Sequence, residues 1–215
     1  MMDGMKILSV SDRVEEHIYH PDLKKRFEGV DMVLGCGDLP YYYIEYLVDC
    51  LCVPTFYVRG NHAFKEEYTD HGPRTQPWGA VDLHKRTVNH KGVLLAGFQG
   101  SVRYRKGDYQ YSQGEMWSMV IGMVPKLLTN KLRFGRYLDI LVTHSPPWGI
   151  NDKPDRAHRG FKAFRWLLET FRPAYQFHGH IHVYSSSEDG KMQFHDTLVI
   201  NTYGYKTLTI NEQNF

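Results

Sequence analysis

Cysteine is scarce in this chain, with three among 215 residues. No two of Cys36, Cys50 and Cys52 have the C-x-x-C spacing of a zinc site. The odd number also argues against the disulfide framework that many small secreted proteins use. A chain of this length can instead bury one sizeable core, and we expect that core to hold the fold.

Long apolar runs are missing as well. No stretch of about 18 apolar residues is present, so the sequence predicts no membrane-spanning helix. Residues 1–10 do not join a basic stretch to an apolar core, so we expect no secretory leader, a cytoplasmic location and no membrane partner. The formal net charge of +2, from 26 basic and 24 acidic residues, gives no general attraction to nucleic acid.

Repeats, low-complexity tracts and Gly/Ser linkers are also absent, so we predict a single domain that covers residues 1–215. The first part of the chain alternates strand-like and helical patterns, which is the rhythm of parallel βαβ units with right-handed crossovers. The strands are expected at 5–11, 31–36 and 53–58, and the helices at 20–27 and 41–51.

The rest of the chain favours hairpins and longer helices. Pro125 should kink or restart the long helix, because proline removes a backbone donor. Parallel units followed by antiparallel hairpins predict a four-layer α-β-β-α sandwich, with two mixed β-sheets flanked by helices. The expected elements are a hairpin at 86–98, helices at 112–133 and 158–171, a hairpin turning at Asp189-Gly190, and strands within 197–210.

Five of the apolar runs stop at a residue that can bind a metal ion. Ligands of open α/β sheets collect at the carboxyl ends of the strands, so we expect these endings to meet at one sheet edge. Oxygen, amide and imidazole donors without a thiolate suit hard to borderline divalent cations. The endings are Asp12, Asp38, Asn61 with His62, His144, and His180 with His182.

The order of these motifs resembles that of the calcineurin-like metallophosphoesterase family. The family pattern is D-x-H, G-D, G-N-H-[DE], a lone histidine and G-H-x-H. The matching residues here are Asp12, Gly37-Asp38, Gly60-Asn61-His62, His144 and Gly179-His180-Ile181-His182. The resemblance implies the sandwich fold and hydrolysis of a phosphodiester or a small phosphorylated molecule, such as a nucleotide. Nucleic acid enters only as a possible substrate, and the oligomeric state is left open.

The resemblance also implies a role for each ligand. Asp38 bridges two cations, which polarise the phosphoryl group and generate the nucleophile, a metal-bridging hydroxide. His62 assists the leaving oxygen as a general acid or stabilises its charge. One or two divalent ions are expected, from manganese, iron, zinc and magnesium, with manganese slightly favoured. Asp12 and His182 complete the first position, and Asn61, His144 and His180 complete the second.

Two departures from the family pattern bear on activity. Val14 stands where D-x-H has its histidine, and Ala63 stands where a carboxylate follows His62. Three protein ligands can still hold a catalytic metal at the first position. A nearby side chain (Glu15, Glu16 or His17) could replace the lost ligand, although a solvated turn explains these residues equally well. The alternative function is a weakly catalytic or non-catalytic scaffold that acts as a binding protein.

Substrate contacts are expected from three residues outside the metal motifs. Asp152 and His158 fit a D…H-x-G pattern that the family uses for substrate, and His158 is also expected to open a helix. Arg103 could clamp a phosphate bidentately. Capping or surface roles are the alternative for Asp152 and His158, and a solvated loop is the alternative for Arg103.

Overall fold

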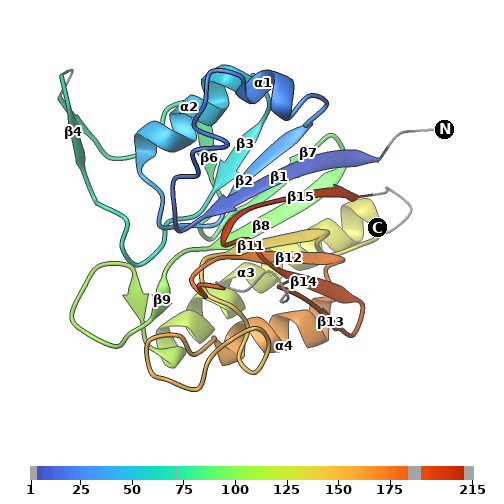
Figure 1. Cartoon of the computed structure of the whole chain (residues 1–215). Coiled ribbons are helices and arrows are strands. Elements are labelled where there is room, and N and C mark those ends of the chain that lie inside the picture. Colours follow the sequence, from blue (N-terminus) through green and yellow to red (C-terminus); the bar gives the residue numbers. More distant parts are fainter. Residues whose placement is uncertain (1–3, 71, 184–189, 211–215) are drawn as a thin grey trace.

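Four layers make up the computed structural model, which describes residues 4–70, 72–183 and 190–210. Two β-sheets lie face to face, and a pair of helices covers the outer side of each (Figure 1). The predicted α-β-β-α sandwich is therefore confirmed. No helix in these residues is both long enough and apolar enough to cross a bilayer.

The first sheet is built mainly from the N-terminal part of the chain, with strand order β15-β1-β2-β3-β6. Its first four strands in sequence are parallel, and the C-terminal strand β15 pairs antiparallel with β1. Helices α1 (Leu23–Arg26) and α2 (Tyr41–Leu51) cover its outer face. The strands are β1 (Met5–Ser11), β2 (Met32–Gly35), β3 (Thr55–Tyr57), β6 (Ala80–Asp82) and β15 (Gly204–Ile210).

The second sheet has the order β13-β14-β12-β11-β8-β7, with four parallel strands between two antiparallel edges. Helices α3 (Gln113–Phe134) and α4 (Lys162–Phe171) pack on its outer face. The strands are β7 (Thr87–His90), β8 (Val93–Phe98), β11 (Ile140–Thr143), β12 (Tyr175–His178), β13 (Lys191–Phe194) and β14 (Thr197–Asn201).

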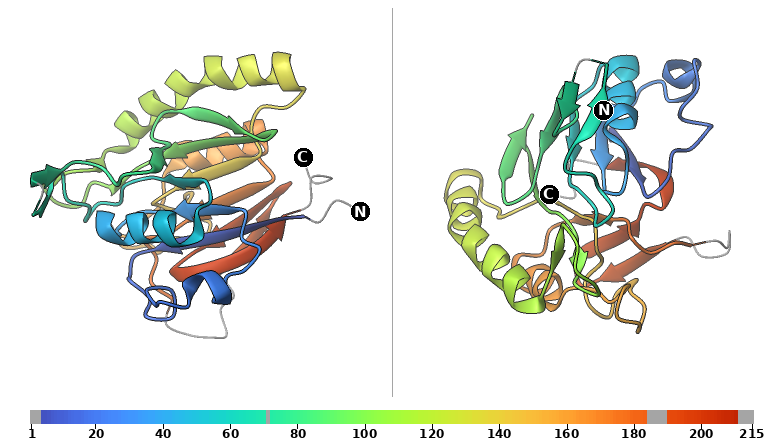
Figure 2. Two further views of the ribbon diagram at one scale, coloured as in Figure 1. Left: turned by 90° about the horizontal axis from the view of Figure 1, so that it is seen from above. Right: turned by 90° about the vertical axis from the view of Figure 1, so that its left-hand side faces the viewer.

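Two short strand pairs lie outside the sandwich. Strands β4 (Glu67–Thr69) and β5 (Gly72–Arg74) form a hairpin that projects away from the layers, as Figures 1 and 2 show. Strands β9 (Ser101–Val102) and β10 (Gln110–Tyr111) form a small parallel pair before α3. The sequence patterns predict neither pair, because such short strands bury too little apolar surface to leave a period-2 signal.

Local sequence explains where the longest helix begins and ends. The Ser112 hydroxyl accepts from the backbone of Glu115, and the Glu115 carboxylate accepts from the backbone of Ser112, which is a capping box. At the other end, Gly135 takes a left-handed conformation with φ 77°. Between them α3 passes through Pro125 as one helix, so of the two predicted alternatives the start of a new segment is wrong.

Two other boundaries differ from the predictions, and a third prediction falls outside the described residues. The helix expected at 20–27 is reduced to Leu23–Arg26. Helix α4 begins at Lys162, so His158 lies in the preceding turn and does not open the helix. The hairpin expected at Asp189-Gly190 involves Asp189, which is outside the described residues. The observed β13–β14 hairpin turns at His195 and Asp196.

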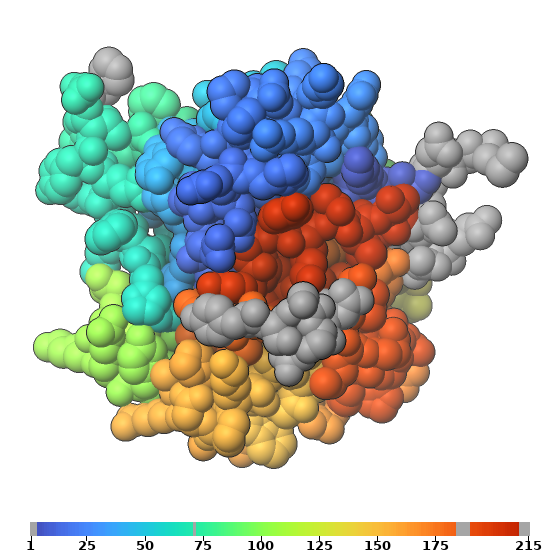
Figure 3. All heavy atoms as spheres, in the orientation of Figure 1, coloured from blue at the N-terminus to red at the C-terminus, as the bar shows by residue number. Residues whose placement is uncertain are grey.

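Three apolar clusters hold the layers together, one between the sheets and one under each pair of helices. The central cluster joins Ile7, Leu34 and Phe56 of the first sheet to Leu95 and Phe177 of the second. Each fully buried side chain of this kind contributes about 1.5–3 kcal/mol. Burial from both sheets therefore fixes their relative position, and with it the distance between their carboxyl ends. In Figure 3 the N-terminal segment (blue) and the segment around 145–170 (orange) lie on opposite sides of the C-terminal strands (red).

Candidate metal centre

The strand endings that the sequence singles out come from two sheets. Asp12, Asp38 and Asn61 follow β1, β2 and β3 of the first sheet. His144 and His180 follow β11 and β12 of the second. The expectation of a single sheet edge is therefore wrong. The carboxyl ends of two packed sheets meet instead, because the central apolar cluster sets them face to face.

Asp12, Asp38 and His144 form the middle of the site. Each offers a ligand atom, and these atoms all lie within 4.8 Å of one another. The side chain of Asp12 is 1% exposed, and the side chain of Asp38 is 9% exposed. Two carboxylates this close and this poorly hydrated repel each other, so the site favours a positive charge between them.

His144 is buried and points its Nε2 atom at two oxygens. The distance is 3.2 Å to Asp38 Oδ2 and 3.1 Å to Asn61 Oδ1. On the other side of the ring, Nδ1 lies 2.9 Å from the backbone carbonyl oxygen of Cys36, which accepts only when Nδ1 carries the proton. In the neutral ring Nε2 then presents its lone pair to the same point as the oxygens. That arrangement suits a cation.

The contact between Asp38 and His144 shifts the pKa of both groups. Burial alone would lower the pKa of His144, but the charge of Asp38 and its hydrogen bond raise that pKa to about 9. Burial alone would raise the pKa of Asp38, but His144 lowers that pKa to about 2, helped by the His62 backbone N–H. In the protein without metal, a proton on His144 thus provides the positive charge that the oxygens require.

The turn after β12 positions the two remaining histidines. His180 has φ 67°, a left-handed conformation, and its backbone N–H donates to both carboxylate oxygens of Asp12 at 3.1 and 3.0 Å. Its ring centroid lies 4.9 Å from that of His144, and Nε2 lies 2.8 Å from the carbonyl oxygen of Ala157. When Nε2 donates there, Nδ1 is the atom with the lone pair. Burial and the charge of His144 lower the pKa of His180 to about 3.

His182 is the most exposed of the proposed ligands. Its side chain is 44% exposed, and Nε2 lies 3.8 Å from Asp12 Oδ1. The ring stacks on Tyr203 with a centroid distance of 4.6 Å. Contacts link all six proposed ligands, but among the described histidines and carboxylates only Asp12, Asp38 and His144 bring their ligand atoms within 4.8 Å of one another, and His182 stands at the rim.

Two motif glycines leave room for the carboxylates. A Cβ atom on Gly60 would overlap the carboxylate of Asp38, and one on Gly179 would overlap Oδ2 of Asp12. These close approaches need a residue without a side chain. The backbone is therefore shaped around the acidic groups. The carboxylate, amide and imidazole donors buried here form a set that divalent cations bind.

The two departures from the family pattern have visible consequences. Val14 packs against the apolar cluster under α1 and α2, so its side chain belongs to the core of that layer. Among the possible replacements, Glu15 pairs with Arg13 at 2.9 Å, and His17 stacks on Tyr205. Within the described residues, neither joins the group formed by the two aspartates and His144.

His62 is exposed at the mouth of the site. Its backbone N–H donates to Asp38 Oδ1 at 2.7 Å, which fixes the chain at this point. Ala63, next to it, provides no carboxylate to orient the imidazole, and within the described residues the hydrogen bond that holds His62 comes from its backbone.

The three expected substrate residues have different environments. His158 lies nearest the centre, with its ring 5.5 Å from that of His180 and its Nδ1 2.9 Å from Asp155. Asp152 accepts the backbone N–H of Gly160 at 2.9 Å. Arg103 donates to both oxygens of Glu115, so its bidentate partner is a residue of α3.

Several supporting groups escape analysis of the sequence. The carbonyl oxygens of Cys36 and Ala157 set the orientation of His144 and His180, and the Tyr104 hydroxyl lies 3.4 Å from Asn61 Nδ2. That contact directs the amide oxygen of Asn61 toward His144. Backbone carbonyls carry no residue-type signal, whereas Tyr104 is marked in the sequence by its place beside Arg103, as a possible phosphate contact and not as a partner of Asn61.

A model of the calcineurin-like phosphoesterase family matches residues 5–184. This chain belongs to that family. The match covers every proposed ligand, from Asp12 to His182. Among curated proteins, none matches the calcineurin-like chain closely enough to count as a relative.

Solved structures agree with the family assignment at the level of the fold. One crystal structure aligns at 16% identity with a TM-score of 0.64, covering 96% of this chain and 95% of the other. The protein TT1561 of Thermus thermophilus aligns at 14% identity with a TM-score of 0.58, covering 96% of this chain and 99% of the other. Identities this low support a shared calcineurin-like fold and nothing further about substrate.

Proposed function

We propose that this calcineurin-like chain is a metal-dependent phosphoesterase that hydrolyses a phosphodiester or a small phosphorylated molecule. The observation that carries the proposal is the position of His144 Nε2, within 3.2 Å of oxygens from Asp38 and Asn61. Side chains from two sheets converge there, which supports a bound cation at this point. The chain carries this geometry at the place where its family holds divalent metals.

Each ligand has a proposed place. Asp12, Asp38 and His182 would hold the first metal position, and Asp38 would also contribute to the second. A bound divalent cation, with manganese favoured, would neutralise charge on the phosphoryl group and lower the pKa of water. Asn61, His144 and His180 would complete the second position.

His62 has the proposed role of assisting bond cleavage. In the hydrolysis, a water oxygen forms the new bond to phosphorus, the bond to the leaving oxygen breaks, and that oxygen takes up a proton. The exposed imidazole of His62 is available to supply the proton, and its backbone bond to Asp38 keeps it beside the reacting group. His158 contributes a substrate contact next to His180.

Hydrolysis of bis(p-nitrophenyl) phosphate, followed with Mn²⁺, tests the proposal. We expect turnover that EDTA removes and fresh Mn²⁺ restores. Asp38→Ala should lose metal and turnover together, whereas Asp49→Ala, an exposed position on α2, should retain both. Full turnover by the Asp38→Ala protein would show that the reaction occurs elsewhere.

A non-catalytic scaffold is the second candidate, and the environment of Val14 favours it. Valine has no atom that can bind a metal, and this side chain packs against the core. The first metal position therefore lacks a ligand that the family usually has. Elemental analysis separates the two candidates. About two ions per chain with turnover supports the enzyme, whereas one or none, without turnover under any divalent metal, supports the scaffold.

A further inference from the structure

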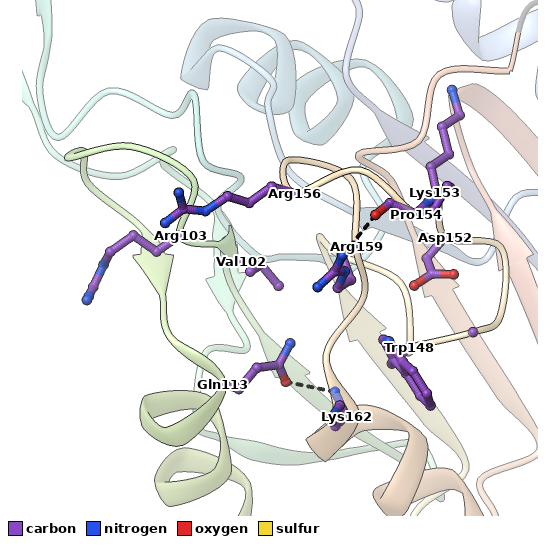
Figure 4. A pocket seen from close by; sticks show the side chains of 11 residues that line it. Val102, Arg103, Gln113, Trp148, Asp152, Lys153, Pro154, Arg156, Arg159 and Lys162 are labelled. Carbon is purple, nitrogen blue, oxygen red and sulfur yellow. Dashed lines mark hydrogen bonds between the residues drawn. The ribbon is translucent and has the colours of Figure 1, made fainter.

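A basic pocket lies beside the metal centre, where the loop 148–162 meets strand β9 and the start of α3 (Figure 4). Its volume is about 730 Å³, and a neighbouring pocket of about 530 Å³ shares two of its lining residues. Among the described residues, Asp152 is the one acidic residue that lines either pocket. The basic residues that line them are Arg103, Arg105, Lys106, Lys153, Arg156, Arg159 and Lys162.

This concentration of charge contrasts with the near-neutral chain, which has a net charge of +2. Two of the basic groups are already engaged. Arg103 is neutralised by Glu115. Lys153 points away from the pocket in Figure 4, and its Nζ lies 3.5 Å from the backbone oxygen of His182.

Three other basic groups face the pocket without an acidic partner in the part of the chain that the structure describes. Arg156 makes no hydrogen bond or ion pair there, and it extends toward the segment that carries Arg103 (Figure 4). Arg159 donates only to the carbonyl oxygen of Pro154, at 2.9 Å. Lys162 places its Nζ 5.2 Å from the ring centroid of Trp148. Positive charges gathered in this way attract a polyanion.

The walls of the pocket are held in place before any ligand binds. Gln113 at the start of α3 accepts the backbone N–H of Lys162 and donates to the carbonyl oxygen of Gly160, both at 3.0 Å. The carboxylate of Asp152 accepts the backbone N–H of Gly160, so it ties the loop together. A preformed wall lowers the conformational cost of binding.

The same loop touches the metal centre. The carbonyl oxygen of Ala157 lies 2.8 Å from His180 Nε2, and Arg156 is the residue before it. The ring of His158, the residue after it, lies 5.5 Å from the ring of His180. The loop that lines the pocket therefore also contacts a proposed metal ligand, which places Arg156 one residue from the centre's edge.

We propose that this pocket binds a second phosphate group of the substrate through Arg156 and Arg159. The substrate is then a small phosphoester with at least one phosphate besides the one that reacts, an inference that rests on the proposed function. Guanidinium groups bind phosphate oxygens in pairs, and a pocket of this volume suits a molecule of nucleotide size. A long nucleic acid would instead need a basic groove that tracks its backbone.

Two chromogenic substrates test the proposal. Thymidine 5′-(p-nitrophenyl phosphate) and its 3′-phosphorylated form share the reacting bond and differ only in the second phosphate. We expect the 3′-phosphate to raise kcat/KM by about 10- to 100-fold, as charged hydrogen bonds to one phosphate do. Arg156→Gln with Arg159→Gln should erase this ratio and leave kcat/KM for the simpler ester within about twofold.

Arg133→Gln is the matched control. Arg133 is an exposed arginine in the last turn of α3, about 30 Å along the helix from Gln113. The variant should keep the full ratio, and circular dichroism should show that all variants fold. If the second phosphate gives no advantage, or if the double variant keeps it, the pocket does not bind substrate. Turnover of the simpler ester would then still support a phosphoesterase.

Binding without turnover gives an independent readout. Isothermal titration calorimetry should show that thymidine 3′,5′-bisphosphate binds at least tenfold more tightly than thymidine 5′-monophosphate, and that the double variant loses this difference. Equal affinities would overturn the proposal whether or not the protein is an enzyme. Displacement of the bisphosphate by a twelve-nucleotide thymidine oligomer at tenfold lower concentration would contradict a small-molecule ligand, because it would identify a nucleic-acid surface.

Discussion

The side chains of Asp38 and His144 meet across the two sheets, with His144 Nε2 3.2 Å from Asp38 Oδ2. Asp38 follows β2 of the first sheet, and His144 follows β11 of the second. Both sheets must therefore be packed before either group reaches the other. The proposed metal centre is a property of the whole sandwich, and metal binding should stabilise it.

The glycine beside Asp38 gives the sharpest steric prediction. Gly60→Ala should abolish Mn²⁺ binding, because the new Cβ would overlap the Asp38 carboxylate and its backbone nitrogen. Gly122→Ala, on the exposed side of α3 with open space around it, should instead raise stability by about 0.5–1 kcal/mol. Elemental analysis and thermal unfolding measure both. Normal metal content in the Gly60→Ala protein would mean that Asp38 is not a ligand.

The missing first-position ligand can be restored. Val14→His should increase both Mn²⁺ occupancy and the rate of diester hydrolysis, at a cost of about 1 kcal/mol in stability from lost packing. Val14→Ala is the control, since it loses the packing and adds no ligand. If the two variants have the same metal affinity, position 14 lies too far from the centre to bind, and the family's first motif does not apply to this chain.

The proposed role of His62 predicts a dependence on the leaving group. A general acid matters most when the leaving oxygen is strongly basic, and it contributes about 10²–10⁴-fold. His62→Gln should therefore reduce the hydrolysis of an alkyl ester far more than that of a p-nitrophenyl ester. The ratio of the two kcat/KM values is the measurement. Equal losses for both esters would assign His62 to binding.

His84 gives a pH prediction away from the metal centre. Burial lowers the pKa of His84 from 6.5 to about 4, and its Nδ1 accepts the backbone N–H of Gln99 at 3.2 Å. The unfolded chain therefore binds the proton more tightly, so stability is full above pH 6.5 and is lost as pH falls toward 4.

His84→Asn retains an acceptor and removes the titration. Between pH 7 and pH 4, urea unfolding should show that the wild type loses roughly 2 kcal/mol more than the variant. Other buried histidines affect both proteins equally, so the difference isolates position 84. Parallel pH profiles would mean that folding does not lower the pKa of His84, so that the folded protein takes up the proton as readily as the unfolded chain.

The sequence predicts the layers and the ligand types better than it predicts their arrangement. Continuous apolar runs such as residues 5–11 mark buried strands, and residues 41–51 form the predicted helix with the same bounds. The sequence places Asp38 and His144 at strand ends but carries no signal for which sheet each strand joins. The pairing of β15 with β1 and of β14 with β12 depends on packing between distant segments.

The pocket is only partly visible in the sequence. Arg156 and Arg159 lie in the same segment as Asp152 and His158, where substrate contacts are expected, but the net charge of +2 does not show that basic groups gather there. Folding brings basic groups of two distant segments, 103–106 and 153–162, to one place, where Asp152 is the one acidic residue in the described lining. No pattern in the sequence reveals that these segments meet.

Anomalous scattering from a crystal grown with Mn²⁺ tests the central claim most directly, because it locates the ion. We predict a peak within bonding distance of Asp38 and His144, and a second one beside Asp12 if both positions fill. A fully occupied crystal with manganese elsewhere, or with no peak between these side chains, would contradict the account.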